Sequence, residues 1–326
     1  MKYRPFGKSG REVSEIGFGA WAIGGGWGPQ AEADSLAALR RALELGVNFI
    51  DTAAGYGNGK SERTIAEVLA GLDDPSAITV ATKTPPTPGI WPPSPYCDMD
   101  ERYPEKYLRE NVAERMEMLR TDRIDILQLH TWTRAWNRDP RPFRTLRKLQ
   151  EEGKIGLVGV STPEHDQNAV IDLIRNGWID SVQLIYNLFE QEPAAELLDT
   201  AAEHGVGVIV RVPFDEGSLT GKFTPETVFP EDDFRRNYFA GDRLERCIRR
   251  VDAIREDLRD SGYTLPQAAL KFILAHPAVS VVIPGMRNAL QAGLNCSVSE
   301  LPDLPEPLLR RLRRHNWRRA FWYSGK

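Results

Sequence analysis

The chain has 326 residues, with 42 lysines and arginines against 46 aspartates and glutamates, so its formal net charge is −4 at pH 7. This weakly acidic balance gives no reason to expect a nucleic acid or an anionic membrane surface as a partner. The three cysteines, Cys97, Cys247 and Cys296, form no CxxC pair, so neither a disulfide framework nor a metal site is expected.

Hydropathy argues against a membrane protein. No apolar run approaches the roughly 18 residues needed to cross a bilayer, and residues 1–6 lack the apolar core of a secretory signal. We therefore expect a soluble, cytoplasmic protein without a membrane partner, folded as a single domain over residues 1–326. The sequence does not indicate its oligomeric state.

The first predicted element is a β-hairpin over residues 3–13 that turns at Lys8-Ser9-Gly10. After it, short runs of β-forming residues alternate with amphipathic stretches of helical period. The eight predicted strands are 16–18, 48–51, 78–82, 124–129, 156–160, 181–185, 207–210 and 279–283. The predicted helices are 34–45, 61–69, 104–119, 142–151, 165–174, 194–204 and 265–275.

Eight βα units without a break in composition predict an α/β fold, a single (β/α)8 TIM barrel with the hairpin before it. A GxGxxA match at residues 17–22 is not read as a Rossmann fingerprint, because the glycine-rich segment 24–28 follows it instead of a helix. The arginine-rich segment 309–323 predicts a packed C-terminal helical extension, with Leu308, Leu312 and His315 on its apolar stripe. Nucleic-acid binding is the less favoured interpretation of this segment.

Four polar residues end or follow three of the predicted strands, 48–51, 78–82 and 124–129. They are a carboxylate, a phenol, an ammonium and an imidazole, at Asp51, Tyr56, Lys83 and His130. Because the carboxyl ends of the strands in a (β/α)8 barrel form one face, and that face carries the chemistry, these four side chains are expected to meet there.

Seven segments follow a family pattern in order along the chain. They are Gly46–Gly57, Ala81–Lys83, Asp125–His130, Gly156–Ser161, Gln183 with Tyr186-Asn187, Gly217–Lys222, and Ile283-Pro284-Gly285 followed by Asn295. With this ordered set the chain resembles the aldo-keto reductase family over nearly its whole length. The resemblance implies a barrel that binds NADPH in an extended pose and reduces a small-molecule aldehyde or ketone to an alcohol.

Such a reduction needs a hydride and a proton. No side chain supplies a hydride, so a nicotinamide must. Tyr56 is the expected acid, but a free phenol has a pKa near 10, so a cation is expected to lower that pKa. Lys83 would be the cation, held in place by Asp51, and His130 would donate a hydrogen bond to the carbonyl oxygen.

The resemblance also implies a set of cofactor-binding residues. Ser161 and Gln183 would hold the nicotinamide carboxamide, and Arg211 would contact the cofactor in place of the tyrosine that many relatives stack on the ring. Arg287 would bind the 2′-phosphate, so NADPH is expected to be preferred over NADH. The remaining candidates, which surround the phosphates and the adenine, are Gly217, Leu219, Gly221, Lys222, Ile283, Gly285, Gln291 and Asn295.

Substrate residues are predicted from long loops on the active face. The proline-rich loop 84–103 and the segment 215–241 are candidate lids, although a polyproline ligand or an inert insertion would also explain the former. Aromatic side chains after the strands predict a wall for a large apolar, cyclic or sugar-ring substrate. The predicted wall consists of Trp21, Trp91 and Trp132, with Trp27, Trp136 and Tyr96 as further candidates.

Two alternatives remain open at the level of sequence. Some members of the family serve as cofactor-sensing accessory subunits of ion channels, and an intact reductase site does not exclude that role. The same site also supports alcohol oxidation or a lyase reaction, because the acid and base roles of Tyr56 interchange with the direction of reaction.

Overall fold

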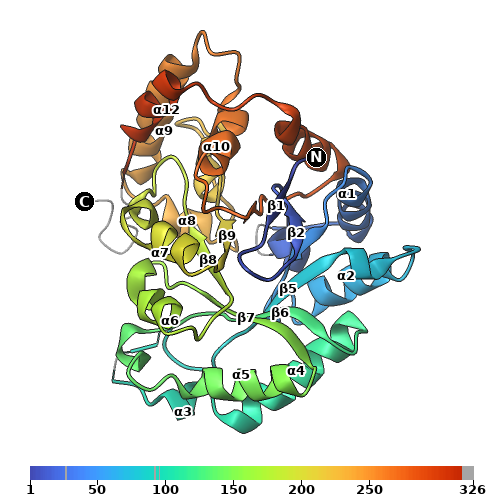
Figure 1. Cartoon of the computed structure of the whole chain (residues 1–326). Coiled ribbons are helices and arrows are strands. Elements are labelled where there is room, and N and C mark those ends of the chain that lie inside the picture. The colour runs from blue at the N-terminus through green and yellow to red at the C-terminus, as the bar shows by residue number, and fades with distance from the viewer. Residues whose placement is uncertain (26–27, 92, 95, 318–326) are drawn as a thin grey trace.

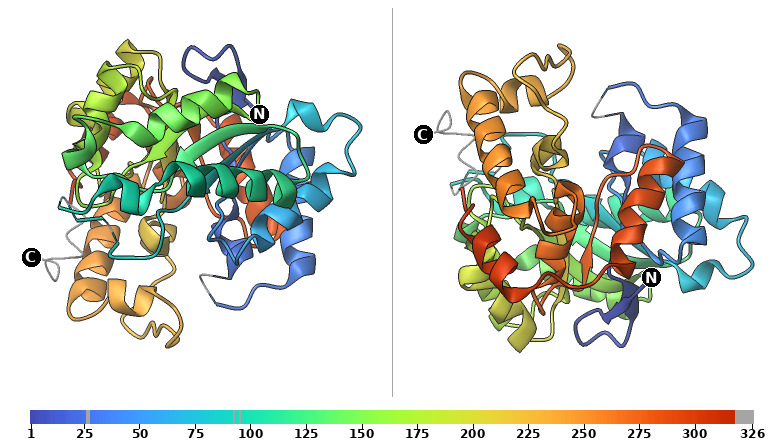
Figure 2. Two further views of the ribbon diagram at one scale, coloured as in Figure 1. Left: turned by 90° about the horizontal axis from the view of Figure 1, so that it is seen from below. Right: turned by 90° about the horizontal axis from the view of Figure 1, so that it is seen from above.

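The computed structural model describes residues 1–25, 28–91, 93–94 and 96–317. Trp27 and the last part of the predicted C-terminal segment, residues 318–323, therefore lie outside the described residues. A ring of strands lies at the centre, and the helices lie around it (Figure 1, Figure 2). The predicted (β/α)8 barrel is thus confirmed.

Eight parallel strands pair with their neighbours in sequence order. They are β3 (Phe18–Gly19), β4 (Phe49–Asp51), β5 (Thr79–Thr84), β6 (Ile124–Leu129), β7 (Ile155–Ser161), β8 (Ser181–Ile185), β9 (Gly207–Arg211) and β10 (Val281–Val282). Parallel bridges from Ile16 to Val282 and from Gly19 to Gly285 join the two ends of the sheet. These bridges close the sheet into a barrel, so it has no free edge.

The helices alternate with the strands and cover the outside of the barrel (Figure 2). The first six are α1 (Glu32–Glu44), α2 (Lys60–Leu69), α3 (Met99–Arg102), α4 (Glu105–Leu119), α5 (Arg141–Glu151) and α6 (Ile171–Arg175). The others are α7 (Leu197–Glu203), α8 (Arg235–Tyr238), α9 (Arg243–Leu258), α10 (Leu265–Leu274), α11 (Ala289–Cys296) and α12 (Glu306–Arg313). No helix of the described residues is both long and apolar enough to cross a membrane.

The sequence patterns predicted every strand, but they did not predict α9. This helix is rich in arginine and acidic residues, which hide an apolar stripe formed by Cys247, Val251, Ile254 and Leu258. The stripe is buried, and α12, α10 and the segment 215–220 all pack against α9 (Figure 1). On α12, Leu308 and Leu312 are buried as predicted. The helix ends at Arg313, so His315 lies beyond it, with its Nε2 2.9 Å from Asp257 Oδ2 of α9.

The N-terminal hairpin closes one end of the barrel. Its strands β1 (Tyr3–Pro5) and β2 (Glu12–Ser14) are antiparallel, and Phe6 between them is fully buried. The Phe6 ring lies 5.7 Å from that of Phe49 and belongs to the apolar cluster inside the barrel. At Gly207 of β9, a Cβ atom would come within 2.5 Å of this ring, so only glycine fits there. The opposite, carboxyl end of the barrel is left to form a site.

The burial of Phe6 predicts a large effect of truncation on stability. Phe6→Ala should lower the free energy of unfolding by about 3–5 kcal/mol, because it leaves a cavity inside the closed end of the barrel. The matched control is Tyr96→Ala, since Tyr96 is 97% exposed and its truncation should cost at most about 0.5 kcal/mol. Thermal and urea unfolding followed by circular dichroism compare the two, and equal midpoints for Phe6→Ala and wild type would contradict the packing described.

Candidate active site

The register of the sheet brings the four predicted polar residues together. Asp51 is the last residue of β4 and pairs with Ala81 of β5, two residues before Lys83. Lys83 in turn pairs with Gln128 of β6, and His130 follows the end of that strand. Because adjacent parallel strands place these residues at one end of the barrel, the side chains converge although they are far apart in sequence.

Tyr56 reaches the same point from the loop after β4. This loop turns at Gly57, whose φ is 65°, and it lies directly against Gly24. A Cβ atom on Gly24 would come within 2.8 Å of the Tyr56 carbonyl carbon, so a side chain there would push the tyrosine loop away. The glycine at position 24 is therefore required by close backbone contact.

Lys83 is fully buried and forms the centre of the site. Its Nζ donates hydrogen bonds to Asp51 Oδ1 at 2.5 Å, to the Thr52 carbonyl at 2.8 Å and to the Tyr56 hydroxyl at 3.3 Å. These contacts use all three N–H donors of the ammonium. Burial lowers the pKa of Lys83, but the nearby Asp51 and Tyr56 outweigh it and the net shift is upward. The side chain therefore stays charged.

Asp51 is held by two amide groups as well as by Lys83. Its Oδ2 accepts hydrogen bonds from Gln183 Nε2 at 2.6 Å and from Gln128 Nε2 at 3.3 Å. A buried ion pair is stable only when its remaining polar atoms find partners, and these two glutamines supply them. Gln128 was not predicted as a site residue, because a single amide side chain within an apolar strand does not by itself indicate a functional role.

The protonation of Tyr56 differs from the sequence expectation. Burial raises the pKa of the phenol, and although Lys83 lowers it, the net shift is above the ordinary value of 10. The cost of burying a phenolate therefore exceeds the attraction of the ammonium, and Tyr56 keeps its proton at neutral pH. Burial, together with the charges of Lys83 and Arg211, holds the pKa of His130 well below 6.5. His130 is thus a neutral hydrogen-bonding group.

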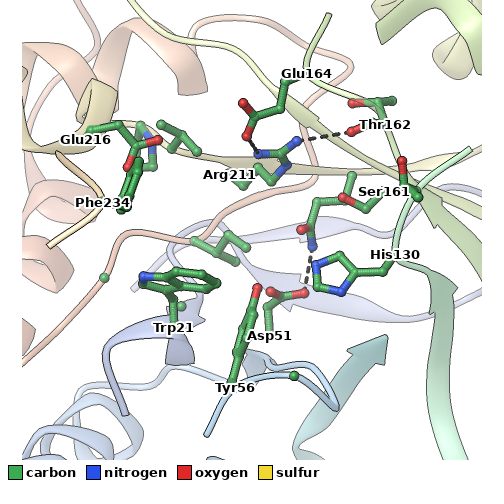
Figure 3. Close-up of a pocket in the computed structure, with 18 of the residues that line it drawn as sticks. Trp21, Asp51, Tyr56, His130, Ser161, Thr162, Glu164, Arg211, Glu216 and Phe234 are labelled. Carbon is green, nitrogen blue, oxygen red and sulfur yellow. Dashed lines mark hydrogen bonds and ion pairs between the residues drawn. The ribbon is translucent and has the colours of Figure 1, made fainter. Parts of the chain in front are cut away.

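A cavity of about 620 Å³ opens beside these residues at the carboxyl end of the barrel. Tyr56 and His130 point into it from one side, and Arg211 and Ser161 face it from another (Figure 3). The predicted residues that line the cavity are Trp21, Asp51, Tyr56, Trp91, His130, Ser161, Gln183, Arg211, Gly217, Ile283 and Gly285. Lys83 is not among them, because it lies beneath the cavity floor.

Two of the three predicted tryptophans form walls of the cavity. Trp21 packs edge to face against Tyr56, with ring centres 4.9 Å apart, and Trp91 packs in the same way against His130 at 5.4 Å. The loop that carries Trp91 is anchored by Arg102, whose Nη1 donates a hydrogen bond to the Ile90 carbonyl at 2.9 Å. The proline-rich loop thus contributes directly to the site.

The prediction for Trp132 is wrong. This side chain is fully buried, packs against Phe143 and donates from Nε1 to Asn137 Oδ1 at 2.7 Å. Its neighbour Thr131 faces the cavity instead. Trp136 is also buried, and Tyr96 is exposed to solvent. The position after a strand identified the loop, but not the face towards which each side chain points.

The residues assigned to the nicotinamide end lie side by side. Ser161 ends β7 and pairs with Gln183 of β8, and Arg211 ends β9 and pairs with Ile185 of β8. The guanidinium of Arg211 donates to Glu164 Oε1 at 3.3 Å and to the Thr162 carbonyl at 3.1 Å (Figure 3). Its Nε atom is buried without a hydrogen-bond partner among the described residues.

The residues assigned to the phosphates and adenine lie farther out. Arg287 donates from Nε to Gln30 Oε1 at 2.9 Å and from Nη2 to the Pro29 carbonyl at 2.5 Å. Leu219 is buried in the core, and Lys222 is exposed. The predicted cofactor-binding residues that do not line the cavity are Leu219, Gly221, Lys222, Arg287, Gln291 and Asn295.

The cavity also contains residues that sequence reasoning missed. Glu164, Glu216 and Phe234 line it (Figure 3). Glu216 and the nearby Val212 have φ values of 56° and 55°, a conformation that sequence patterns rarely indicate for residues other than glycine. A usable signal existed for Glu164, which follows Ser161 closely in the loop after β7.

Comparison with known proteins agrees with this geometry. The model of the aldo/keto reductase family matches residues 15–316. L-galactose dehydrogenase from Arabidopsis thaliana is 30% identical over 318 residues, which cover 93% of this chain and 90% of that protein. The NADH-specific methylglyoxal reductase of Escherichia coli is 29% identical, with 92% and 95% covered.

A solved structure has the same fold. It is the holo form of the aldo-keto reductase AKR11C1 from Bacillus halodurans, which superposes with a TM-score of 0.76 and is 26% identical over 97% of this chain and 96% of that one. The match of the family model over most of the chain is decisive for membership. This chain belongs to the aldo/keto reductase family, whose members are oxidoreductases that act on aldehydes or ketones with a nicotinamide cofactor.

Proposed function

We propose that this protein reduces an aldehyde or ketone to an alcohol with NADPH, and that Tyr56 is the general acid. The observation that carries the proposal is the Lys83 ammonium, which is bonded to both Asp51 and the Tyr56 hydroxyl at the edge of a cavity. A buried cation beside a phenol has no evident structural need, whereas it stabilises the phenolate that remains after proton donation.

The residues around the cavity fit a nicotinamide cofactor. Ser161 and Gln183 offer hydrogen-bonding groups for a carboxamide, and Arg211 has an unpartnered Nε within the described part of the chain. Gly217 and Gly285 line the cavity without side chains, which allows close approach of a ligand to the backbone. When bound, the nicotinamide supplies the hydride that no side chain can supply.

The protein's own residues handle the proton. Tyr56 donates its hydroxyl proton to the oxygen of the carbonyl group as that oxygen gains negative charge, and Lys83 at 3.3 Å stabilises the phenolate left behind. Neutral His130 keeps one ring N–H with which to orient the same oxygen. Bulk water then returns a proton to Tyr56. One hydride and one proton together convert the carbonyl group to an alcohol.

The walls of the cavity support a ring-shaped substrate. Trp21 and Trp91 present aromatic faces and edges, which pack well against apolar or sugar rings. The relative from Arabidopsis thaliana, an L-galactose dehydrogenase by name, supports a sugar as the substrate. Alcohol oxidation would use the same groups in reverse, with the Tyr56 phenolate as base. A sensing subunit would bind cofactor tightly without turnover.

Substitution of Tyr56 tests the proposal. Tyr56→Phe removes the acidic hydroxyl and should lower kcat by at least about 100-fold, while the dissociation constant for NADPH stays within about twofold of wild type. The measurement is NADPH consumption by the purified protein with a panel of aromatic, aliphatic and sugar-derived aldehydes and ketones.

The matched control is Tyr3→Phe, because the Tyr3 hydroxyl bonds the Gly46 carbonyl and neither residue lines the cavity. This variant should keep wild-type turnover. Near-normal turnover by Tyr56→Phe would contradict the assignment of the acid, and tight NADPH binding without turnover by wild type would favour the sensing role.

The pKa shifts predict how the rate depends on pH. Because burial raises the pKa of Tyr56 above 10 and lowers that of His130 below 6.5, neither group changes protonation between pH 7 and 9. The kcat for reduction should therefore be nearly flat across this range, whereas alcohol oxidation, which needs the phenolate, should rise about tenfold per pH unit. Steady-state rates in both directions check this, and a fall in reduction centred near pH 7 would contradict it.

The preference for NADPH rests on Arg287 at the start of α11. A guanidinium near a helix N-terminus favours a phosphate group. Arg287→Ala should weaken NADPH binding by at least about tenfold, because it removes a charged hydrogen bond, and should leave NADH binding nearly unchanged. Calorimetric titration with both cofactors measures this, and equal affinity of the wild type for NADH and NADPH would reverse the proposed preference.

A further inference from the structure

The ion pair between Arg211 and Glu164 lines the cavity, and the proposed mechanism does not use it. We infer that Arg211 and Glu164 set the relative affinity of the site for the oxidised and reduced forms of the cofactor, with Arg211 disfavouring the oxidised form and Glu164 opposing it. This inference rests on the proposed function, because it concerns the same site.

The chemical basis is a difference of one charge. The nicotinamide ring carries a positive charge when it is oxidised and none when it is reduced. A fixed cation close to the ring therefore weakens the binding of the oxidised form only, and a fixed anion strengthens it. Interactions with the phosphates and the adenine are common to both forms and cancel when the two dissociation constants are compared.

Arg211 lies close to the residues that we propose hold the nicotinamide ring. It ends β9 next to β8, which carries Gln183, and it lines the same cavity as Ser161 and Gln183. Figure 3 shows its guanidinium above Asp51 and Tyr56, across the open space of the cavity. The charge of Arg211 contributes to lowering the pKa of both Tyr56 and His130, so its field extends over the reacting groups.

The other cation of the site is already neutralised. The Lys83 ammonium is paired with Asp51 at 2.5 Å, and both side chains are 3% exposed or less. Glu164, by contrast, is 42% exposed and lies 3.3 Å from Arg211, which is only 18% exposed. Because Glu164 is more exposed than Arg211, water screens its negative charge more strongly than the positive charge of Arg211. The pair therefore leaves a net positive potential in the cavity.

The third acid of the cavity lies elsewhere. Glu216 is placed beside Phe234, at the end of the cavity away from His130 (Figure 3). Its effect on a ring held near Ser161 and Gln183 is therefore weaker than that of Arg211. Substitution of Arg211 or Glu164 changes the local charge without altering Asp51, Tyr56, Lys83 or His130.

The test is the ratio of the dissociation constants of NADP⁺ and NADPH, measured by calorimetric titration at fixed pH and ionic strength. Arg211→Gln should lower this ratio by about fivefold, and Glu164→Gln should raise it by about the same factor, as expected for one charge in a partly screened site. Arg211→Lys, which keeps the charge, should stay near the wild-type ratio. The readout needs no turnover.

Asp166→Asn is the matched control, because Asp166 lies two residues beyond Glu164, pairs with Arg134 and does not line the cavity. It should leave the ratio unchanged. The inference is overturned if Arg211→Gln and Glu164→Gln leave the ratio unchanged or shift it in the same direction, or if Arg211→Lys behaves like Arg211→Gln. If the wild type binds neither NADP⁺ nor NADPH, the proposed function fails as well, so the two failures are distinguishable.

Discussion

The buried ion pair between Lys83 and Asp51 is the interaction on which the site depends. Both side chains are almost completely buried, so each charge is stable only because the other lies within hydrogen-bonding distance and because Gln128 and Gln183 satisfy the second carboxylate oxygen. The four residues come from β4, β5, β6 and β8. The pair therefore forms only when these strands are in register, which links the chemistry of the site to the closure of the barrel.

The protonation states of the site result from competition between burial and charge. For Tyr56, the loss of hydration outweighs the attraction of Lys83, and the phenol remains protonated. For His130, burial and the two nearby cations act in the same direction and keep the imidazole neutral. Both groups thus carry a transferable or donatable proton at neutral pH, which suits a site that adds a proton to a carbonyl oxygen. Lys83 serves the phenolate after transfer more than the phenol before it.

The loops around this centre add specificity through contacts that are not periodic in sequence. Trp91 packs on His130, and its loop is bonded to Arg102 at the Ile90 carbonyl. Arg211 is held by Glu164 and the Thr162 carbonyl. By contrast, Trp132, which follows a strand just as closely, points away from the cavity and is buried in the hydrophobic core. A loop residue next to a strand can face either side, because the strict alternation of a strand ends with its hydrogen-bond ladder.

The sequence by itself determined the barrel and which four polar residues, Asp51, Tyr56, Lys83 and His130, meet at its carboxyl end. Alternating apolar periods fixed the strands to within a few residues, and the position of each polar residue at a strand end implied convergence at one face. Only the tertiary structure decided the direction of the Tyr56 pKa, the inward or outward orientation of each tryptophan, and the entry of Glu164 and Glu216 into the cavity. These properties depend on solvent exclusion and on contacts between segments distant in the chain, which no local pattern of residues records.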